Sequence, residues 1–174
     1  HPTGVNELYG VNTNLTTAAD IQAAIRAKVA ETPPGYWVNG FMFDDTKVVD
    51  GPLHRTHLDD VAPEHPVNVA HRGGHTNWYN SKAFELAGIS RDTPDPEDGR
   101  FQRDAEGNLS GMVAENARQV FNSVGRRDTL TDEQQRDRAR EGMAHISQLL
   151  TAAGLTTVHD AGANRSKLVA YQDA

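Results

Sequence analysis

The sequence contains no cysteine among its 174 residues, and this absence removes several kinds of chemistry at once. Disulfide bonds, zinc sites built on thiolates and a cysteine nucleophile are all excluded. Long hydrophobic runs are missing as well. No stretch approaches the ~18 apolar residues of a membrane span, and no charged segment followed by an apolar one opens the chain. We therefore expect a soluble, cytoplasmic protein with no membrane partner.

An excess of positive charge is also absent. The chain has 17 Lys and Arg against 24 Asp and Glu, a formal net charge of −7, whereas proteins that bind the nucleic-acid backbone need a cationic surface. This balance predicts no nucleic-acid partner. Hydrophobic residues still make up 37% of the chain, and their periodic spacing indicates a folded domain rather than a disordered one.

Capping residues and apolar spacing predict the helices. Thr17 with Asp20, and Thr131 with Gln134, have the spacing at which side chains satisfy the free amides of a first helical turn. The second pair starts the longest periodic stretch of the chain, which a glycine ends. Helices are expected over residues 17–31, near residues 57–61, over residues 81–87 and from residue 131 to residue 154.

Aromatic and β-branched residues predict the strands. Residues 36–43 are rich in both, and residues 67–71 alternate as a strand does before two glycines end it. A turn-forming tetrapeptide at residues 104–107 lies between two extended arms, 100–103 and 108–113, which predicts a β-hairpin. A last strand is expected over residues 155–159. It follows a helix and a glycine, which is the order of an αβ step in an α/β protein.

Eight histidines are many for a chain of this size, and their spacing decides whether they indicate a metal site. His54 and His57 lie three residues apart beside two aspartates. They form either a metal cluster or, as is commoner in a polar loop, a set of solvated side chains. His65 lies between prolines and His145 lies off the apolar stripe of its helix, so we expect both at the surface.

Three other polar residues follow expected strands. His75 comes after a strand end and two glycines, where backbone can approach a ligand closely, or where a tight turn merely exposes the imidazole. Glu115 follows an apolar strand, and it either complements a helix dipole or faces a site. Asp160 ends the expected strand 155–159, the position at which barrel strands carry active-site residues. Its alternative is an Asx-type turn before Gly162.

An ordered set of short motifs gives the chain a resemblance to a known family. The motifs are Trp37-Val38-Asn39-Gly40, Phe43-Asp44, Leu58-Asp59, Pro66-Val67, Gly74-His75, Asn80-Ser81-Lys82-Ala83, Leu86-Ala87-Gly88-Ile89, Arg103-Asp104, Gly111 with Glu115 and Ala117, and Gly154-Leu155-Thr156 with His159-Asp160-Ala161-Gly162. In this order they resemble the metal-dependent amidohydrolases that include N-substituted formamide deformylases. The resemblance covers residues 36–162, and its specificity comes from the order of many motifs, each weak alone.

The resemblance implies a metal-binding (β/α)₈ barrel with a long insertion between its early strands. The fold class expected for the chain is α/β, or α+β as an excised piece, made of the insertion subdomain and an adjoining αβ unit of the barrel. Residues 1–35 are expected beside the barrel with the first helix, residues 36–128 in the insertion, and residues 129–174 in a helix-strand-helix unit. The chain is then expected to be an internal fragment of a longer enzyme.

The same resemblance implies hydrolysis of an amide-type C–N bond in a small-molecule substrate. The nucleophile would be water activated by a divalent metal, with zinc the expected ion. His1 fits the second His of the family's His-x-His metal motif, and the other ligands are expected outside this chain. His75, Glu115 and Asp160 are then expected to line the pocket, with Glu115 able to reach the metal.

Two expectations concern the chain by itself. With so few metal ligands it should be inactive, and residues 132–159 should expose apolar surface that would otherwise pack on barrel neighbours, so self-association is expected. The competing hypothesis is a non-catalytic α+β lid or interaction module that folds on its own and binds no metal.

Overall fold

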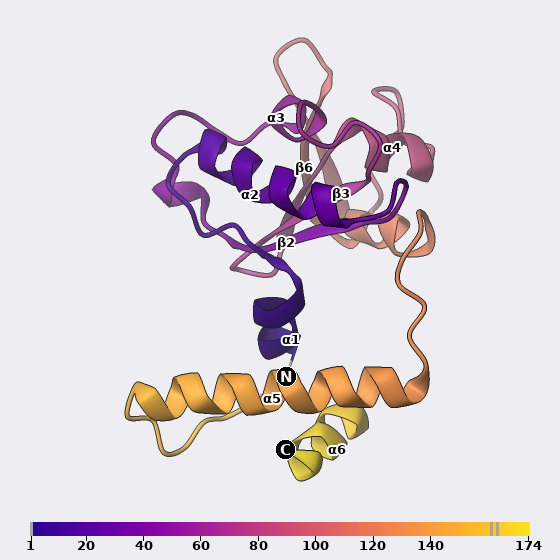
Figure 1. Cartoon of the computed structure of the whole chain (residues 1–174). Coiled ribbons are helices and arrows are strands. Elements are labelled where there is room, and N and C mark those ends of the chain that lie inside the picture. Colours follow the sequence, from indigo (N-terminus) through magenta and orange to yellow (C-terminus); the bar gives the residue numbers. More distant parts are fainter. Residues whose placement is uncertain (1, 161, 163) are drawn as a thin grey trace. The chain divides into compact units, whose positions relative to one another are not determined.

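The computed structural model describes residues 2–160, 162 and 164–174 of the chain (Figure 1). It divides into two compact units. Residues 11–128 form one, which we call the sheet unit, and the described part of residues 1–10 and 129–174 forms the other, the helical unit. Every helix within the described residues is too short or too polar to span a bilayer.

The sheet unit holds all the strands of the described chain. Its elements are β1 (Val11–Asn12), α2 (Ala18–Glu31), β2 (Val38–Phe43), η1 (Asp45–Lys47), α3 (Arg55–Asp59), β3 (Val67–His71), β4 (Thr76–Tyr79), α4 (Ser81–Ala87), β5 (Gly99–Arg103), β6 (Leu109–Glu115) and η2 (Asn116–Ser123), where η marks a 3-10 helix.

The six strands form one sheet in the order β1-β2-β3-β4-β6-β5. β1, β2 and β3 run parallel, whereas β4 is antiparallel to both β3 and β6, and β5 pairs with β6 as a hairpin. The carboxyl ends of β2, β3 and β6 therefore meet the amino end of β4 at one end of the sheet. This end positions the candidate site.

Helices α2 and α3 cover one face of this sheet (Figure 1). Ile21 and Ile25 of α2 and Leu58 of α3 are fully buried in one hydrophobic cluster with residues of the sheet. Val67 and Val69 supply the β3 side of this core, because residues two apart in a strand point to the same face. Burying each such side chain contributes roughly 1.5–3 kcal/mol of transfer free energy.

Aromatic side chains form a second core, which α4 and η2 help to build. Tyr79 of β4 stacks on Phe121 of η2 with ring centroids 3.8 Å apart, and Phe84 of α4 meets Phe121 edge-on at 5.5 Å. Burial raises the pKa of Tyr79 to about 12, so its hydroxyl stays protonated at neutral pH. It accepts a hydrogen bond from the Asn77 amide at 3.4 Å.

The helical unit consists of α1 (Pro2–Tyr9), α5 (Asp132–Ala152) and α6 (Arg165–Asp173). α1 and α6 both pack on α5 (Figure 1). The contact with α1 depends on a buried glycine, because a Cβ at Gly142 would lie 2.7 Å from the backbone nitrogen of Val5. Arg136 of α5 holds Asp173 at the end of α6, with its Nη2 2.8 Å from Oδ1.

Most of the elements predicted from the sequence are confirmed. Thr17 Oγ1 accepts from the Asp20 amide at 3.0 Å and caps α2. Thr131 and Gln134 form the capping box expected at the start of α5, with bonds of 3.2 and 2.9 Å. The predicted helix 81–87 is α4, and the short helix expected near residue 57 is α3. The strands expected over residues 36–43 and 67–71 are β2 and β3, and the predicted hairpin consists of β5 and β6.

The strand predicted over residues 155–159 was wrong. These residues have no regular secondary structure, and Leu155 and Val158 are 50% and 54% exposed. A strand requires a neighbour to receive its backbone hydrogen bonds, and all the strands of the described residues lie in the sheet unit. An apolar run without such a neighbour does not form a strand, whatever its residue preferences.

Two features of the sheet unit were not foreseen. Strand β4 was not predicted, because the double glycine by itself indicates only the end of β3. The two glycines in fact form a turn between β3 and β4, in which the Gly74 amide donates to His71 O at 3.0 Å. The prediction that His65 lies at the surface was wrong. It is buried, with Nε2 3.1 Å from the carbonyl oxygen of Thr32, because its segment packs against the end of α2.

Candidate functional site

Polar side chains gather at the end of the sheet where β2, β3 and β6 finish and β4 begins. This cluster, which we call the polar end, comprises Asp44, Asp45, His71, Arg72, His75 and Glu115. Parallel strands bring the ends of β2 and β3 together, with Phe43 paired to His71. The antiparallel pairing of β4 with β6 brings Glu115 next to His75. The strand order therefore assembles residues as far apart as 44 and 115.

His75 and Glu115, both named from the sequence, contact each other directly. The Nδ1 atom of His75 lies 3.0 Å from Oε1 and 3.2 Å from Oε2 of Glu115. Their backbones also pair, since the Glu115 amide donates to His75 O at 2.9 Å. Both side chains are well exposed, 75% for His75 and 56% for Glu115. The pair is thus built by the sheet yet remains open to a ligand.

The pair fixes which imidazole nitrogen of His75 is free. A carboxylate only accepts hydrogen bonds, so Nδ1 of the neutral ring carries the proton and donates to Glu115. Nε2 has no hydrogen-bond partner among the described residues. It therefore presents a lone pair to solvent. A histidine oriented in this way by a carboxylate is suited to proton transfer or to metal ligation.

The backbone at Glu115 is strained. Its φ of 51° and ψ of −133° lie in a region that glycine enters freely and other residues rarely do. Arg118 clamps this residue from η2, because its Nε donates to Glu115 O at 3.0 Å while its Nη1 donates to Asn77 Oδ1 at 3.1 Å. Asn77 is buried within β4. Strain held in place by neighbouring contacts is typical of functional sites.

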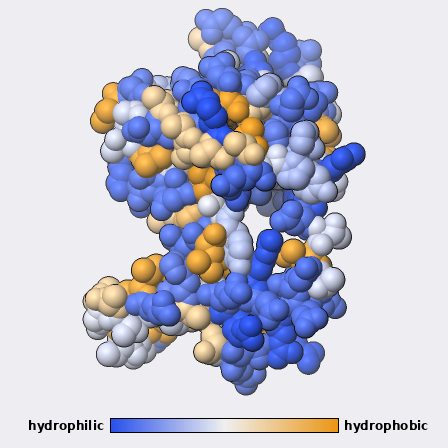
Figure 2. Space-filling view, viewed as in Figure 1, coloured by the Kyte–Doolittle hydropathy of each residue, from blue (hydrophilic) through white to orange (hydrophobic). Residues whose placement is uncertain are grey.

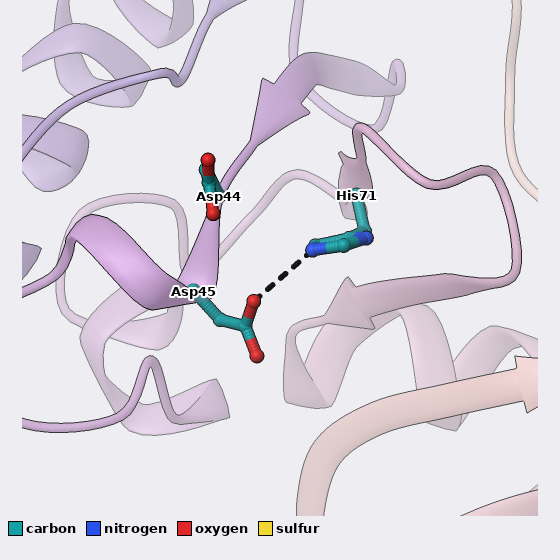
Figure 3. Close-up of side chains that lie close together, drawn as sticks. All are labelled: Asp44, Asp45 and His71. Atoms are coloured by element: carbon teal, nitrogen blue, oxygen red, sulfur yellow. Dashed lines mark hydrogen bonds and ion pairs between the residues drawn. The ribbon is translucent and has the colours of Figure 1, made fainter.

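Asp44, Asp45 and His71 form a second group at the polar end. One ligand atom from each lies within 4.8 Å of the others, a spacing that a metal ion could use. Figure 3 shows Asp45 directed at His71, and the His71 Nε2 atom lies 3.1 Å from Asp45 Oδ1. Oxygen and imidazole nitrogen are the ligand types that divalent metals such as zinc prefer.

The hydrogen bonds of this group show that it is satisfied without a metal. Asp44 is buried, and its oxygens accept from Thr46 Oγ1 at 2.6 Å and from Arg72 Nε at 2.8 Å. The Thr46 hydrogen bond, followed by its amide and the Arg72 charge, holds the pKa of Asp44 below its usual value. A cation here would have to compete with the Arg72 guanidinium.

The tautomer of His71 leads to the same conclusion. Its Nδ1 accepts from the Gly73 amide at 3.0 Å, so the neutral ring carries its proton on Nε2 and donates it to Asp45. Metal binding at Nε2 would move that proton to Nδ1, where it would face the Gly73 N–H. His71 is therefore a structural partner of Asp45 as it stands, whereas His75 has a free nitrogen.

Asp160 and His1 are the remaining predicted site residues. Asp160 belongs to the helical unit, where its Oδ1 accepts from the Gly162 amide at 2.9 Å, the geometry of the Asx-type turn that the sequence left open. Its other oxygen accepts from the Tyr171 hydroxyl, which is the first cause of its lowered pKa. His1 lies outside the described residues. The roles of both in the parent protein remain predictions.

His54 and His57 do not form a metal cluster. The His54 side chain caps α3 by accepting from the Thr56 amide, and His57 Nδ1 accepts from the His54 amide at 3.1 Å. Both rings thus act in a helix cap. The sequence did not single out Asp45 and His71 as a pair. The rule that was applied to His75 is that polar residues at strand ends face a site. The same rule would have found both residues.

The sequence of this chain matches a known family along its whole length. Residues 1–174 match the amidohydrolase family. The chain therefore belongs to the amidohydrolase family. The expected resemblance to metal-dependent amidohydrolases is confirmed.

Two curated relatives show how much of a family member the chain represents. It is 32% identical over 162 residues to the N-substituted formamide deformylase of Arthrobacter pascens, which covers 92% of this chain and 29% of that protein. It is 31% identical over 121 residues to the exoenzymes regulatory protein AepA of Pectobacterium carotovorum subsp. carotovorum, covering 65% of this chain and 23% of that protein. The chain spans less than a third of the length of these relatives.

Solved structures support the fold. The chain is similar to an uncharacterized metal-dependent hydrolase from Pyrococcus horikoshii OT3, with a TM-score of 0.52 and 19% identity, covering 98% of this chain and 31% of that one. A second such hydrolase, from Pyrococcus furiosus, gives a TM-score of 0.50 at 18% identity and covers 32% of its chain. The mixed α/β class expected for a piece of an amidohydrolase barrel is confirmed.

Proposed function

We propose that the protein containing this chain hydrolyses amide-type C–N bonds of small molecules with the help of a divalent metal, and that the polar end faces its reaction centre. Membership of the amidohydrolase family supports the reaction class. Similarity to an N-substituted formamide deformylase supports the kind of bond. The observation that carries the proposal is the His75–Glu115 pair, with its free Nε2 and strained backbone.

When bound, a divalent metal, which we expect to be zinc, supplies Lewis acidity and an activated water. The described residues do not complete a site for it, because the Asp44–Asp45–His71 group is already satisfied by its own hydrogen bonds and by Arg72. His1 and residues beyond this chain are therefore the proposed ligands. On the same ground the isolated chain is proposed to be inactive, and zinc-dependent turnover of a formamide by it would contradict this.

His75 and Glu115 have separate tasks in this proposal. The His75 Nε2 atom accepts a proton from the attacking water or returns one to the departing nitrogen. Glu115 holds the ring by Nδ1 and stabilises the imidazolium that forms when Nε2 takes up the proton. Arg118 keeps the Glu115 backbone in place. Asp160 is proposed as a further residue of the pocket wall.

The test is kinetic and uses the full-length protein. His75→Ala and Glu115→Ala should each lower kcat/KM by ~10²-fold, because a positioned acid or base contributes about that much. The melting temperature should change little, since both side chains are exposed. The measurement is steady-state hydrolysis of an N-substituted formamide beside a thermal melt of each variant.

His71→Ala provides a matched control. It breaks a histidine–carboxylate contact of similar length at the same end of the sheet, 3.1 Å to Asp45, but removes no free nitrogen. Its kcat/KM should stay within ~10-fold of wild type, the range of an indirect effect. Unchanged turnover in both His75→Ala and Glu115→Ala would refute the proposal and favour a non-catalytic lid or interaction module.

A further inference from the structure

A separate cavity lies at the opposite end of the sheet from His75 and Glu115. Its volume is about 330 Å³, within the range of small-molecule sites. α4 and the loop after it, the start of β6 and Arg55 of α3 form its walls. Ser81 of this wall follows the end of β4, whereas His75 precedes its start. The cavity is therefore distinct from the polar end.

The walls of this cavity carry positive charge in a chain whose net charge is −7. Arg55 and Arg91 both line it. The acid that lines it within the described chain is Glu85, and Lys82 already pairs with Glu85 at 3.1 Å. Arg91 is held in place by a bond from its Nη2 to Glu106 O at 3.3 Å, and its contact with the exposed Asp92 is loose, at 4.0 Å. The local balance favours an anion.

The Arg55 guanidinium has hydrogen-bonding capacity left over. Its Nη1 donates to Ser81 Oγ at 2.5 Å, and its Nε is buried with no acceptor among the described residues. Ser81 in turn donates to Asp59 Oδ2 at 2.7 Å, so the Asp59 carboxylate reaches Arg55 through a hydroxyl. A partly desolvated guanidinium without a direct anionic partner is costly, and an oxyanion bound in the cavity that Arg55 lines would offset that cost.

Gly111 explains how Arg55 comes to this position. Its φ is +109°, and a Cβ there would lie 2.9 Å from the backbone nitrogen of Arg55 and 3.0 Å from the backbone oxygen of Tyr79. Only glycine lets β6 pass so close to the first residue of α3. The backbone that carries Arg55 is thus fixed against the sheet, and the bond from Nη1 to Ser81 orients the guanidinium, so little further ordering is needed on binding.

The rest of the lining is apolar. Phe84, Ile89 and Leu109 face the same cavity, with Asn108 and two serines among the polar groups. A cationic wall beside an apolar one selects a ligand with an anionic head and a short hydrocarbon tail. We propose that this cavity binds a small monocarboxylate, with its head at Arg55 and Arg91 and its tail against Phe84. The proposal does not depend on the proposed hydrolase activity.

Calorimetry on the purified protein tests this assignment. Butanoate should bind, and butanamide, which has the same size without the charge, should bind at least ~10-fold more weakly because it lacks the charge-assisted hydrogen bonds. Inorganic phosphate serves as an anion without a tail. Tighter binding of phosphate than of butanoate, or equal binding of butanamide, would overturn the assignment to a carboxylate.

Variants locate the binding. Arg91→Gln should weaken butanoate binding at least ~10-fold while leaving the fold intact, because the Arg91 side chain is 58% exposed. Arg55→Lys should weaken it similarly, since a single ammonium cannot hold the Ser81 hydroxyl and a carboxylate in the fixed geometry of a guanidinium. Arg26→Gln removes one exposed positive charge from α2 and should have no effect. Absence of butanoate binding to wild type, or equal affinity in all three variants, would refute the proposal.

Discussion

Glu115 has a backbone conformation that most residues avoid, and its surroundings show how that conformation is kept. Its amide bonds to His75, its carbonyl accepts from Arg118, and Asn77 anchors the same guanidinium. The carboxylate of Glu115 points at the His75 ring because the main chain is held in this way. Two substitutions of Glu115 can separate the effect of the backbone strain from the effect of the carboxylate.

We expect Glu115→Gly to be more stable than Glu115→Ala by about 1 kcal/mol. Both variants lose the carboxylate, but glycine adopts φ 51° and ψ −133° without strain, a relief larger than its extra entropy in the unfolded chain. Urea unfolding of the two variants measures the difference. An alanine variant as stable as the glycine variant would show that the backbone relaxes, and would remove the argument for stored strain.

At the level of elements, side-chain caps decide where helices begin. Thr17, Asn80 and Thr131 each accept a hydrogen bond from the amide three residues later. α3 is unusual because a histidine caps it, with His54 accepting from Thr56. An imidazole accepts through Nδ1 only while that atom is unprotonated, so this cap depends on pH.

Acidification should therefore weaken the cap of α3. Burial, and then the positive charges of Arg55 and His57, lower the pKa of His54, while Asp104 and Asp59 act in the opposite direction. The pKa of His54 is therefore lower in the folded chain than its value of about 6.5 in the unfolded chain. The resulting stabilisation of the fold is complete above the unfolded pKa and is lost as pH falls through the folded pKa.

The matched comparison is His54→Asn, because asparagine caps helices and does not titrate. The free energy of unfolding in urea should fall more for wild type than for His54→Asn between about pH 7.5 and about pH 5. Other titrating groups are common to both proteins, so the difference isolates His54. Parallel pH profiles would show that the histidine cap does not contribute this dependence.

At the level of the whole molecule, the helical unit exposes apolar side chains. Leu149, Leu155, Val158 and Leu168 are 47–54% exposed, and Figure 2 shows apolar residues at the surface among mostly hydrophilic ones. Where such side chains form a contiguous patch, the patch usually marks a contact with another part of a protein. The expected partner is the rest of the parent barrel.

The isolated chain should self-associate through this surface. We expect the apparent mass from light scattering to rise with concentration for wild type and to stay monomeric for the double variant Leu149→Glu and Leu168→Glu, because buried charge opposes association. Val49→Glu is the control, since Val49 is 80% exposed but lies in the sheet unit. A wild-type chain that stays monomeric at high concentration would contradict this prediction.

The sequence by itself determined the local elements and the family. Caps, glycines and apolar periods act over a few residues, so α2, α4, α5 and the β5–β6 hairpin could be predicted with their bounds nearly correct. It also indicated His75 and Glu115 as site residues, because each follows an apolar strand. Residues 155–159 show the limit of this reasoning, since a strand also needs a partner that the pattern does not contain.

Only the tertiary structure decided which residues meet. His75 and Glu115 are 40 positions apart, and their contact depends on β6 pairing with β4 rather than with another strand. The same holds for Asp45 with His71, and for the burial of His65 against Thr32. Sheet order and register follow from the packing of the whole unit, so no short segment of sequence encodes them.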